Sequence, residues 1–153
     1  MSHTYSQLLY HIVFSTKYRE KLIVPEIQAS LYPFMLSVVR SERGELPAIG
    51  GMPDHVHLLV QLKPHHCLSD LMRGVKANSS RLVREDIGLP EFSWLEGFGA
   101  FSVSQSGATA VRRYIQTQEN HHLRRTFESE WVTLLESHGI EYDPTDPFGD
   151  KSP

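Results

Sequence analysis

Two histidines separated by one residue open an apolar run at residues 55–62, HVHLLVQL. Side chains alternate along a strand, so His55 and His57 share one face, and the other face is formed by Val56, Leu58, Val60 and Leu62. Two imidazoles on one strand face are a usual way to hold a divalent metal ion, and the preceding Asp54 could orient one of them. In a chain with nine histidines, this pair alone is equally compatible with metal binding and with surface or structural histidines.

A second chemical pattern is VRRYIQTQ at residues 111–118. Tyr114 and Gln118 are four residues apart and would lie on the same face of a helix. A phenol with a pKa near its free value of about 10 attacks a phosphodiester slowly, and a nearby cation both stabilises the phosphate charge and positions the group. The Gln118 amide oxygen could complete a metal-ligand set with His55 and His57 that suits Mg²⁺ or Mn²⁺. Taken alone, the segment favours a packing tyrosine and an ordinary exposed glutamine, so the chemical interpretation depends on its pairing with the histidine strand.

The chain of 153 residues is long enough for one domain with its own core. Cys67 is the single cysteine, which excludes an internal disulfide framework. No apolar run approaches the length of about 20 residues that a membrane span needs, and the first ten residues lack a signal-peptide pattern. We therefore expect a cytoplasmic protein with no membrane partner.

Charge is distributed unevenly along the chain. The formal net charge is -3, yet residues 1–126 contain 14 Lys/Arg against 11 Asp/Glu, a net of +3. The acidic excess lies in residues 127–153, with one Lys against seven Asp/Glu. Phosphate binding requires a local basic surface and not a basic whole protein, so nucleic acid remains a possible partner. We expect one domain over residues 1–142 and a poorly ordered acidic tail over 143–153.

The elements that must position these residues follow from hydrophobic periodicity and from Gly and Pro punctuation. The expected strands cover residues 7–15, 46–51, 55–62 and 94–104; the expected helices cover 25–43, 68–87, 109–122 and 129–137. The order strand, helix, strand, strand, helix, strand predicts an α+β fold of the ferredoxin-like split βαβ type. We expect an antiparallel sheet with helices on one face, additional C-terminal helices, and the two histidines on the more open face.

The chain resembles the single-tyrosine HUH transposases, the group of small insertion-sequence and REP-associated tyrosine transposases. The resemblance extends over about residues 5–142, in the order that the family shows. Its motifs are YHIVFSTKYR at 10–19, MPDHVHLLV at 52–60, KANSSR at 76–81, the segment 94–104, and YIQTQ at 114–118 followed by His121 and His122.

This resemblance implies a homodimer with composite active sites, in which His55, His57 and Gln118 bind Mg²⁺ or Mn²⁺. It implies that Tyr114 attacks a phosphate of single-stranded DNA, keeps the 5′ side as a phosphotyrosine and releases a 3′-hydroxyl. A later attack by a 3′-hydroxyl reseals the strand, so no nucleotide cofactor is needed. The expected partners are single-stranded DNA and imperfect DNA hairpins at element ends.

Six basic residues are candidates for phosphate contacts, although a solvated surface charge explains each of them equally well: Lys17, Arg19, Lys76, Arg81, Arg112 and Arg113. For His121 and His122, packing and DNA contact both remain open. The acidic tail would repel DNA, so we expect it to lie away from the groove.

Two alternatives keep the fold and change the function. The first is a domesticated REP-associated relative that processes chromosomal hairpin repeats with the same active site. The second is a non-catalytic dimer that binds hairpin DNA, which the presence of Tyr114, His55 and His57 disfavours. A metal-binding protein of this fold without a DNA role would leave the spacing from Tyr114 to Gln118 unexplained.

Overall fold

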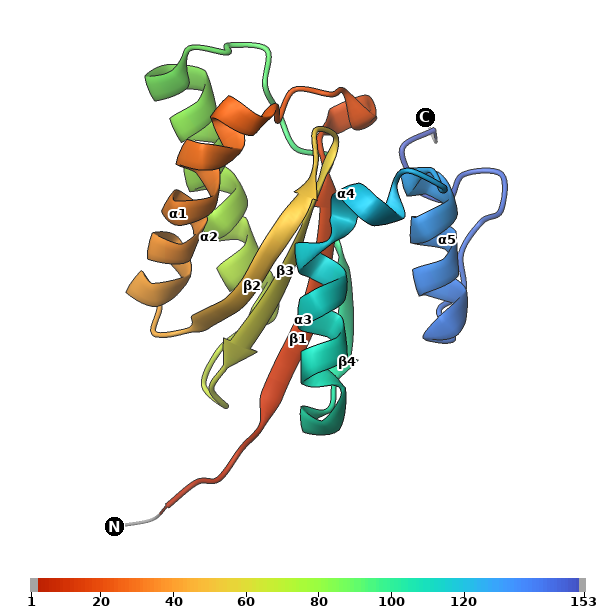
Figure 1. Cartoon of the computed structure of the whole chain (residues 1–153). Helices are drawn as coiled ribbons and strands as arrows, with labels where there is room; N and C mark the ends of the chain where they lie inside the picture. The colour runs from red at the N-terminus through yellow and green to blue at the C-terminus, as the bar shows by residue number, and fades with distance from the viewer. Residues whose placement is uncertain (1–2, 152–153) are drawn as a thin grey trace.

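A four-stranded antiparallel sheet forms the centre of the computed structural model, which describes residues 3–151 (Figure 1). Its strands are β1 (Leu8–Ser15), β2 (Glu45–Met52), β3 (His55–Leu62) and β4 (Gly99–Val103), in the spatial order β2-β3-β1-β4. β1 pairs with both β3 and β4, and His55 lies opposite Ser15 in the β1–β3 register. This topology confirms the ferredoxin-like split βαβ plan.

Two long helices cover one face of the sheet. α1 (Pro25–Ser41) begins at a proline, whose fixed φ and missing N–H suit a first helical turn. α2 (Leu68–Arg81) continues into a π-helical turn (Leu82–Ile87) that ends at Gly88, where φ is 95°. The main core fills the space between these helices and the sheet; its buried residues include Ile12, Phe14, Leu31, Met35, Val56, Leu58, Met72 and Val75.

The opposite face of the sheet carries three further helices: α3 (Ala108–Gln116), α4 (Gln118–His121) and α5 (Phe127–Ser137) (Figure 1). Ile115 of α3 packs on Ala48 and Leu59, whereas Phe127 and Leu135 of α5 pack against Val13 and Phe101. The histidine face is therefore closed, and our expectation of an open face was wrong. No helix within residues 3–151 is long and apolar enough to cross a membrane.

Two elements end elsewhere than their periodicity predicts. The helix expected over 109–122 breaks at Thr117, whose hydroxyl donates to the Arg113 carbonyl and whose φ and ψ are not helical. The strand expected over 94–104 begins only at Gly99. Trp94 instead forms a bridge with Thr16 and packs into the main core, where its indole N–H donates to the Ser79 hydroxyl at 3.0 Å.

Residues 143–151 pack back onto the domain, unlike the poorly ordered tail that their composition suggests; residues 152–153 lie outside the described residues. The Phe148 ring stacks on Trp131, whose indole N–H donates to the Pro147 carbonyl at 2.8 Å. Asp150 accepts a 2.6 Å bond from the Arg19 guanidinium. The stacked Phe148 ring and the Arg19–Asp150 ion pair hold the segment, and neither contact can be inferred from its amino-acid composition.

Candidate active site

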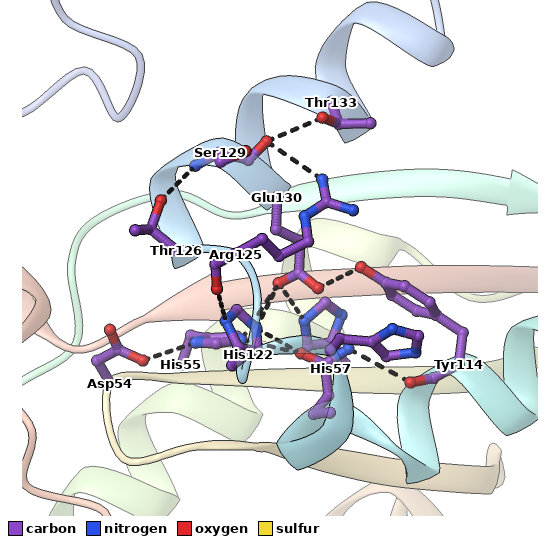
Figure 2. Close-up of polar contacts among 12 residues, drawn as sticks. Asp54, His55, His57, Tyr114, His122, Arg125, Thr126, Ser129, Glu130 and Thr133 are labelled. Atoms are coloured by element: carbon purple, nitrogen blue, oxygen red, sulfur yellow. Dashed lines mark hydrogen bonds and ion pairs between the residues drawn. The ribbon is translucent and has the colours of Figure 1, made fainter.

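Strand β3 presents His55 and His57 to the layer formed by α3, α4 and α5, and both side chains are fully buried. Figure 2 shows them beside Tyr114 of α3, Glu130 of α5 and His122, which directly follows α4. His55 Nδ1 lies 2.7 Å from Asp54 Oδ1, so the carboxylate orients this ring as expected. His57 Nδ1 lies 2.8 Å from Nε2 of His11 on β1, a buried partner that we did not predict from the sequence.

Helix α3 brings Tyr114 close to these histidines because β2 has a glycine, Gly50, where the helix backbone approaches it. A Cβ atom at Gly50 would lie 2.1 Å from the Ile115 carbonyl oxygen, so only glycine permits this approach. Ile115 is completely buried against the sheet, and the next residue toward the N-terminus is the tyrosine. The Tyr114 hydroxyl donates a hydrogen bond to Oε2 of Glu130 (Figure 2).

Gln118 reaches the same site although the helix breaks before it. Its amide nitrogen donates to the Tyr114 carbonyl at 3.3 Å, which fixes the orientation of the amide. The amide oxygen then lies 3.2 Å from His55 Nε2 and 3.0 Å from His122 Nε2. Our prediction that Tyr114, Gln118 and the histidines of β3 lie together therefore agrees with the geometry, and His122 joins them.

The residue missing from the sequence prediction is Glu130, which is fully buried near the start of α5. Its Oε1 atom lies 3.0 Å from His57 Nε2, 3.3 Å from His55 Nε2 and 3.2 Å from His122 Nε2. In the sequence, Glu130 reads as one of the acidic residues that favour the first turn of a helix. Nothing in the local pattern indicates that α5 folds over the distant histidine strand.

Burial and hydrogen bonding set the charges of the site. Burial disfavours a charged Glu130, but hydrogen bonds from His122, His55 and His57 outweigh it and hold the pKa of the carboxyl far below its usual range. Burial also opposes charge on His55, yet its bonds to Asp54 and Glu130 raise the pKa of this imidazole. By contrast, burial lowers the pKa of His57 to about 4.

Tyr114 is held as a neutral phenol in this arrangement. Burial, followed by the hydrogen bond to the Glu130 carboxylate, raises the pKa of the phenol above its ordinary value. The charge of Arg125 acts in the opposite direction. A cation or a phosphate held close to the phenol would therefore change its ionisation most directly.

The donor set fits a divalent metal ion. One ligand atom from each of His55, His122 and Glu130 lies within 4.8 Å of the others, and Gln118 adds a neutral oxygen. Imidazole nitrogens with one carboxylate suit first-row divalent ions, and the oxygen donors extend the choice toward Mn²⁺ and Mg²⁺. The structure thus supports the prediction of a metal site in coarse form, without specifying the ion.

The six predicted DNA contacts differ in their surroundings. Lys17, Arg112 and Arg113 are exposed, and the two arginines directly precede Tyr114 on α3. Arg19 is paired with Asp150, and Arg81 lies on α2, on the other side of the sheet from the histidines.

Lys76 is bound within the chain itself. Its ammonium group donates to the carbonyls of Leu95 and Gly97, at 2.7 and 2.5 Å. Burial lowers the pKa of this ammonium to about 8.

A groove of about 840 Å³ begins at the edge of the site, where Asp54 and His122 line it. Its other lining residues include five basic side chains: Arg19, Lys21, Arg124, Arg125 and Lys151. The tail also lines this groove, through Asp146, Pro147 and Phe148, in contrast to our expectation that it lies away from it. Four of the five basic residues were absent from the sequence prediction because their proximity arises only in the folded chain.

Comparisons with known proteins agree with this architecture. The chain is 26% identical over 122 residues to the ISDra2 transposase TnpA of Deinococcus radiodurans, covering 74% of this chain and 86% of that protein. It is 25% identical over 124 residues to the transposase for insertion sequence element IS200 of Salmonella typhimurium, covering 77% and 81%.

Two solved structures have the same fold. A putative transposase from Deinococcus radiodurans superposes with a TM-score of 0.63 at 26% identity, covering 75% of this chain and 93% of that one. A REP-associated tyrosine transposase bound to a REP hairpin superposes with a TM-score of 0.57 at 17% identity, covering 75% and 68%. The sequence model of the family described as "Transposase IS200 like" matches residues 4–118, three quarters of the chain. The chain therefore belongs to the IS200-like transposase family.

Proposed function

We propose that this transposase cuts and rejoins single-stranded DNA through a covalent bond between Tyr114 and a DNA phosphate. The observation that carries the proposal is the convergence of a tyrosine hydroxyl, a buried carboxylate and three imidazoles in one site. A buried cluster of this kind is costly to assemble unless its groups act together on a ligand. The family match supplies the DNA substrate class.

In the proposed reaction the Tyr114 oxygen attacks a backbone phosphorus atom and the bond from phosphorus to the 3′ oxygen breaks. Glu130 Oε2, which already accepts the phenol hydrogen bond, is placed to receive the proton. The leaving 3′ oxygen takes up a proton and becomes a free 3′-hydroxyl, while the 5′ side stays on the tyrosine. When bound, a divalent ion would supply charge stabilisation at the phosphate oxygens, held by His55 and Gln118 among others.

We propose that the DNA strand follows the basic groove beside His122. Five basic side chains line it, and Arg125 lies close enough to Tyr114 to affect its ionisation. Backbone contacts of this kind position a strand without reading its sequence. A DNA hairpin as the recognised partner is supported by the similar structure described as bound to a REP hairpin. Lys17, Arg112 and Arg113 remain proposed contacts, since they are exposed.

Every group of the described site comes from a single chain. Tyr114 meets the histidine strand of its own molecule, so the composite site that we expected in a homodimer is not needed to bring these groups together. We retain the homodimer as a proposal in which each protomer carries its own site. Processing of chromosomal hairpin repeats would use the same chemistry and would differ in genomic context.

The test is incubation of the full chain with Mn²⁺ or Mg²⁺ and a labelled single-stranded hairpin from the gene's own flanks, followed by denaturing gels. We expect a covalent protein–DNA band that requires the metal and is lost in Tyr114→Phe. Hairpin binding without such a band, across several flanking substrates, would refute the catalytic proposal and favour a non-catalytic binding protein.

A further inference from the structure

The C-terminal segment beyond the family match places two donor atoms in the site. The match ends at Gln118, whereas His122 and Glu130 follow it and come from α5 and the loop before it. Both lie close to His55 of β3 (Figure 2). The family match therefore says nothing about the roles of His122 and Glu130, and what we infer for them rests on the proposed metal-assisted function.

Hydrogen bonding fixes which nitrogen of each ring carries its hydrogen. His55 Nδ1 lies 2.7 Å from the Asp54 carboxylate, and His122 Nδ1 lies 3.0 Å from the Arg125 carbonyl oxygen. Carboxylate and carbonyl oxygens only accept, so both Nδ1 atoms must be the donors. In the neutral tautomers, the Nε2 atoms of both rings then present lone pairs.

Those two Nε2 atoms face two oxygens that are themselves acceptors. Gln118 Oε1 and Glu130 Oε1 each lie between the rings, and the four atoms form a closed ring with edges of 3.2, 3.0, 3.2 and 3.3 Å. The Gln118 amide cannot turn its nitrogen inward without losing its bond to the Tyr114 carbonyl. Four lone-pair donors held this close together require either additional protons on both imidazoles or a cation.

The size of this ring matches a metal-ligand set. Two ligands at right angles around an ion with bonds of about 2.1 Å are about 3.0 Å apart, and at a tetrahedral angle about 3.4 Å apart. All four edges fall within that interval. The arrangement of Asp54 behind His55 is the carboxylate–histidine pairing that accompanies metal-binding imidazoles.

We infer that Glu130 and His122 are ligands of the divalent metal ion, together with His55 and Gln118. The C-terminal helix therefore completes the metal site of its own chain. Because Glu130 binds through Oε1, its Oε2 remains free to hold the Tyr114 hydroxyl beside the ion. His57 Nε2, 3.0 Å from the same Oε1, supports this carboxylate from the strand side.

The experiment measures Mn²⁺ binding by isothermal titration calorimetry on the full chain, without DNA. Glu130→Gln and His122→Phe should each weaken binding tenfold or more, whereas Glu128→Gln, an exposed change of the same charge on the same helix, should leave it unaltered. Far-UV circular dichroism and metal-free melting establish that each variant is folded. Tyr114→Phe should bind Mn²⁺ with at most a small loss, because the phenol is not a ligand.

A spectroscopic measurement keeps the inference testable if a variant does not fold. Electron spin-echo spectra of Mn²⁺ bound to the wild-type chain should show coupling to imidazole nitrogen, and His122→Phe should reduce it. Wild-type or tighter Mn²⁺ binding by folded Glu130→Gln would overturn the inference, because the Glu130 carboxylate would then contribute nothing to binding of the ion. If that variant still formed the metal-dependent covalent band, the proposed function would stand and only the ligand assignment would fail.

Discussion

Gly50 lies on β2 where α3 crosses the sheet with no room for a side chain. The Cβ of an alanine there would lie 2.1 Å from the Ile115 carbonyl oxygen, and real Cβ atoms essentially never come within 3.0 Å of a neighbour. The helix backbone must therefore withdraw by at least about 0.9 Å at this point, the difference between those two distances. Overpacking of this kind costs about 1–3 kcal/mol of stability.

Tyr114 precedes Ile115, so the displacement moves the phenol away from Glu130 and the imidazoles. A misplacement of about 1 Å at a reacting group can cost about 100-fold in rate. We expect Gly50→Ala to lower the rate of covalent adduct formation by roughly that factor and to lower the free energy of unfolding by about 1–3 kcal/mol. Denaturant unfolding and single-turnover gel assays measure the two effects separately.

Gly74→Ala is the matched control, because Gly74 lies within α2 with no atom within 4 Å of the added Cβ. Replacing a helical glycine by alanine should raise the free energy of unfolding by about 1 kcal/mol and leave the reaction rate unchanged. Wild-type stability and wild-type rate in Gly50→Ala would refute the close approach of the Ile115 carbonyl of α3 to Gly50 of β2.

Three further predictions concern groups around the site. Burial lowers the pKa of His11 to about 3, so below pH 6.5 the unfolded chain binds a proton at His11 that the folded chain does not bind. The free energy of unfolding should therefore fall between pH 6.5 and pH 4, and it should fall less steeply in His11→Gln than in wild type. Denaturant titrations at several pH values measure this slope. Asp150→Asn should tighten binding of hairpin DNA severalfold in fluorescence anisotropy, because it frees Arg19 and removes a negative charge near the groove. Lys76→Met should lower the free energy of unfolding by about 2 kcal/mol in chemical denaturation, because two carbonyls lose a charged donor.

Each of these predictions has a contradicting result. The charged or titratable groups that act on His11 are His57, Glu130 and His138, so an unchanged pH slope in the variant would show that these and not His11 dominate the acid response. Glu85→Gln, in the helical layer on the other face of the sheet, controls for net charge in the DNA experiment. Equal tightening in both variants would show that the change in net charge, and not the release of Arg19, causes the effect. Wild-type stability of Lys76→Met would mean that water replaces the ammonium without loss.

The sequence predicts the sheet and the first two helices well because each of their features is local. The apolar alternation after His55, the proline at position 25 and the glycine at position 88 each mark a strand or a helix end within a few residues. The ferredoxin-like order then follows from the sequence of elements. The same local patterns separate the histidine face of β3 from its apolar face.

The parts of the site that the sequence does not predict depend on contacts between distant elements. Glu130 is separated from His55 by 75 positions, and its helical context is that of an ordinary acidic first-turn residue. The break at Thr117 has no signal in the local apolar pattern, and beyond it His122 Nε2 lies 3.0 Å from the Gln118 amide oxygen. Arg125 reaches the same region from the loop before α5.

Covalent attachment of DNA to Tyr114 can be located by peptide mapping of the adduct. The protein–DNA species formed with Mn²⁺ is digested with nuclease and protease, and the nucleotide-bearing peptide is located by mass spectrometry. We expect a nucleotide linked through its 5′ phosphate to Tyr114. Attachment to any other residue, or no adduct on hairpin substrates that the protein binds, would contradict this expectation.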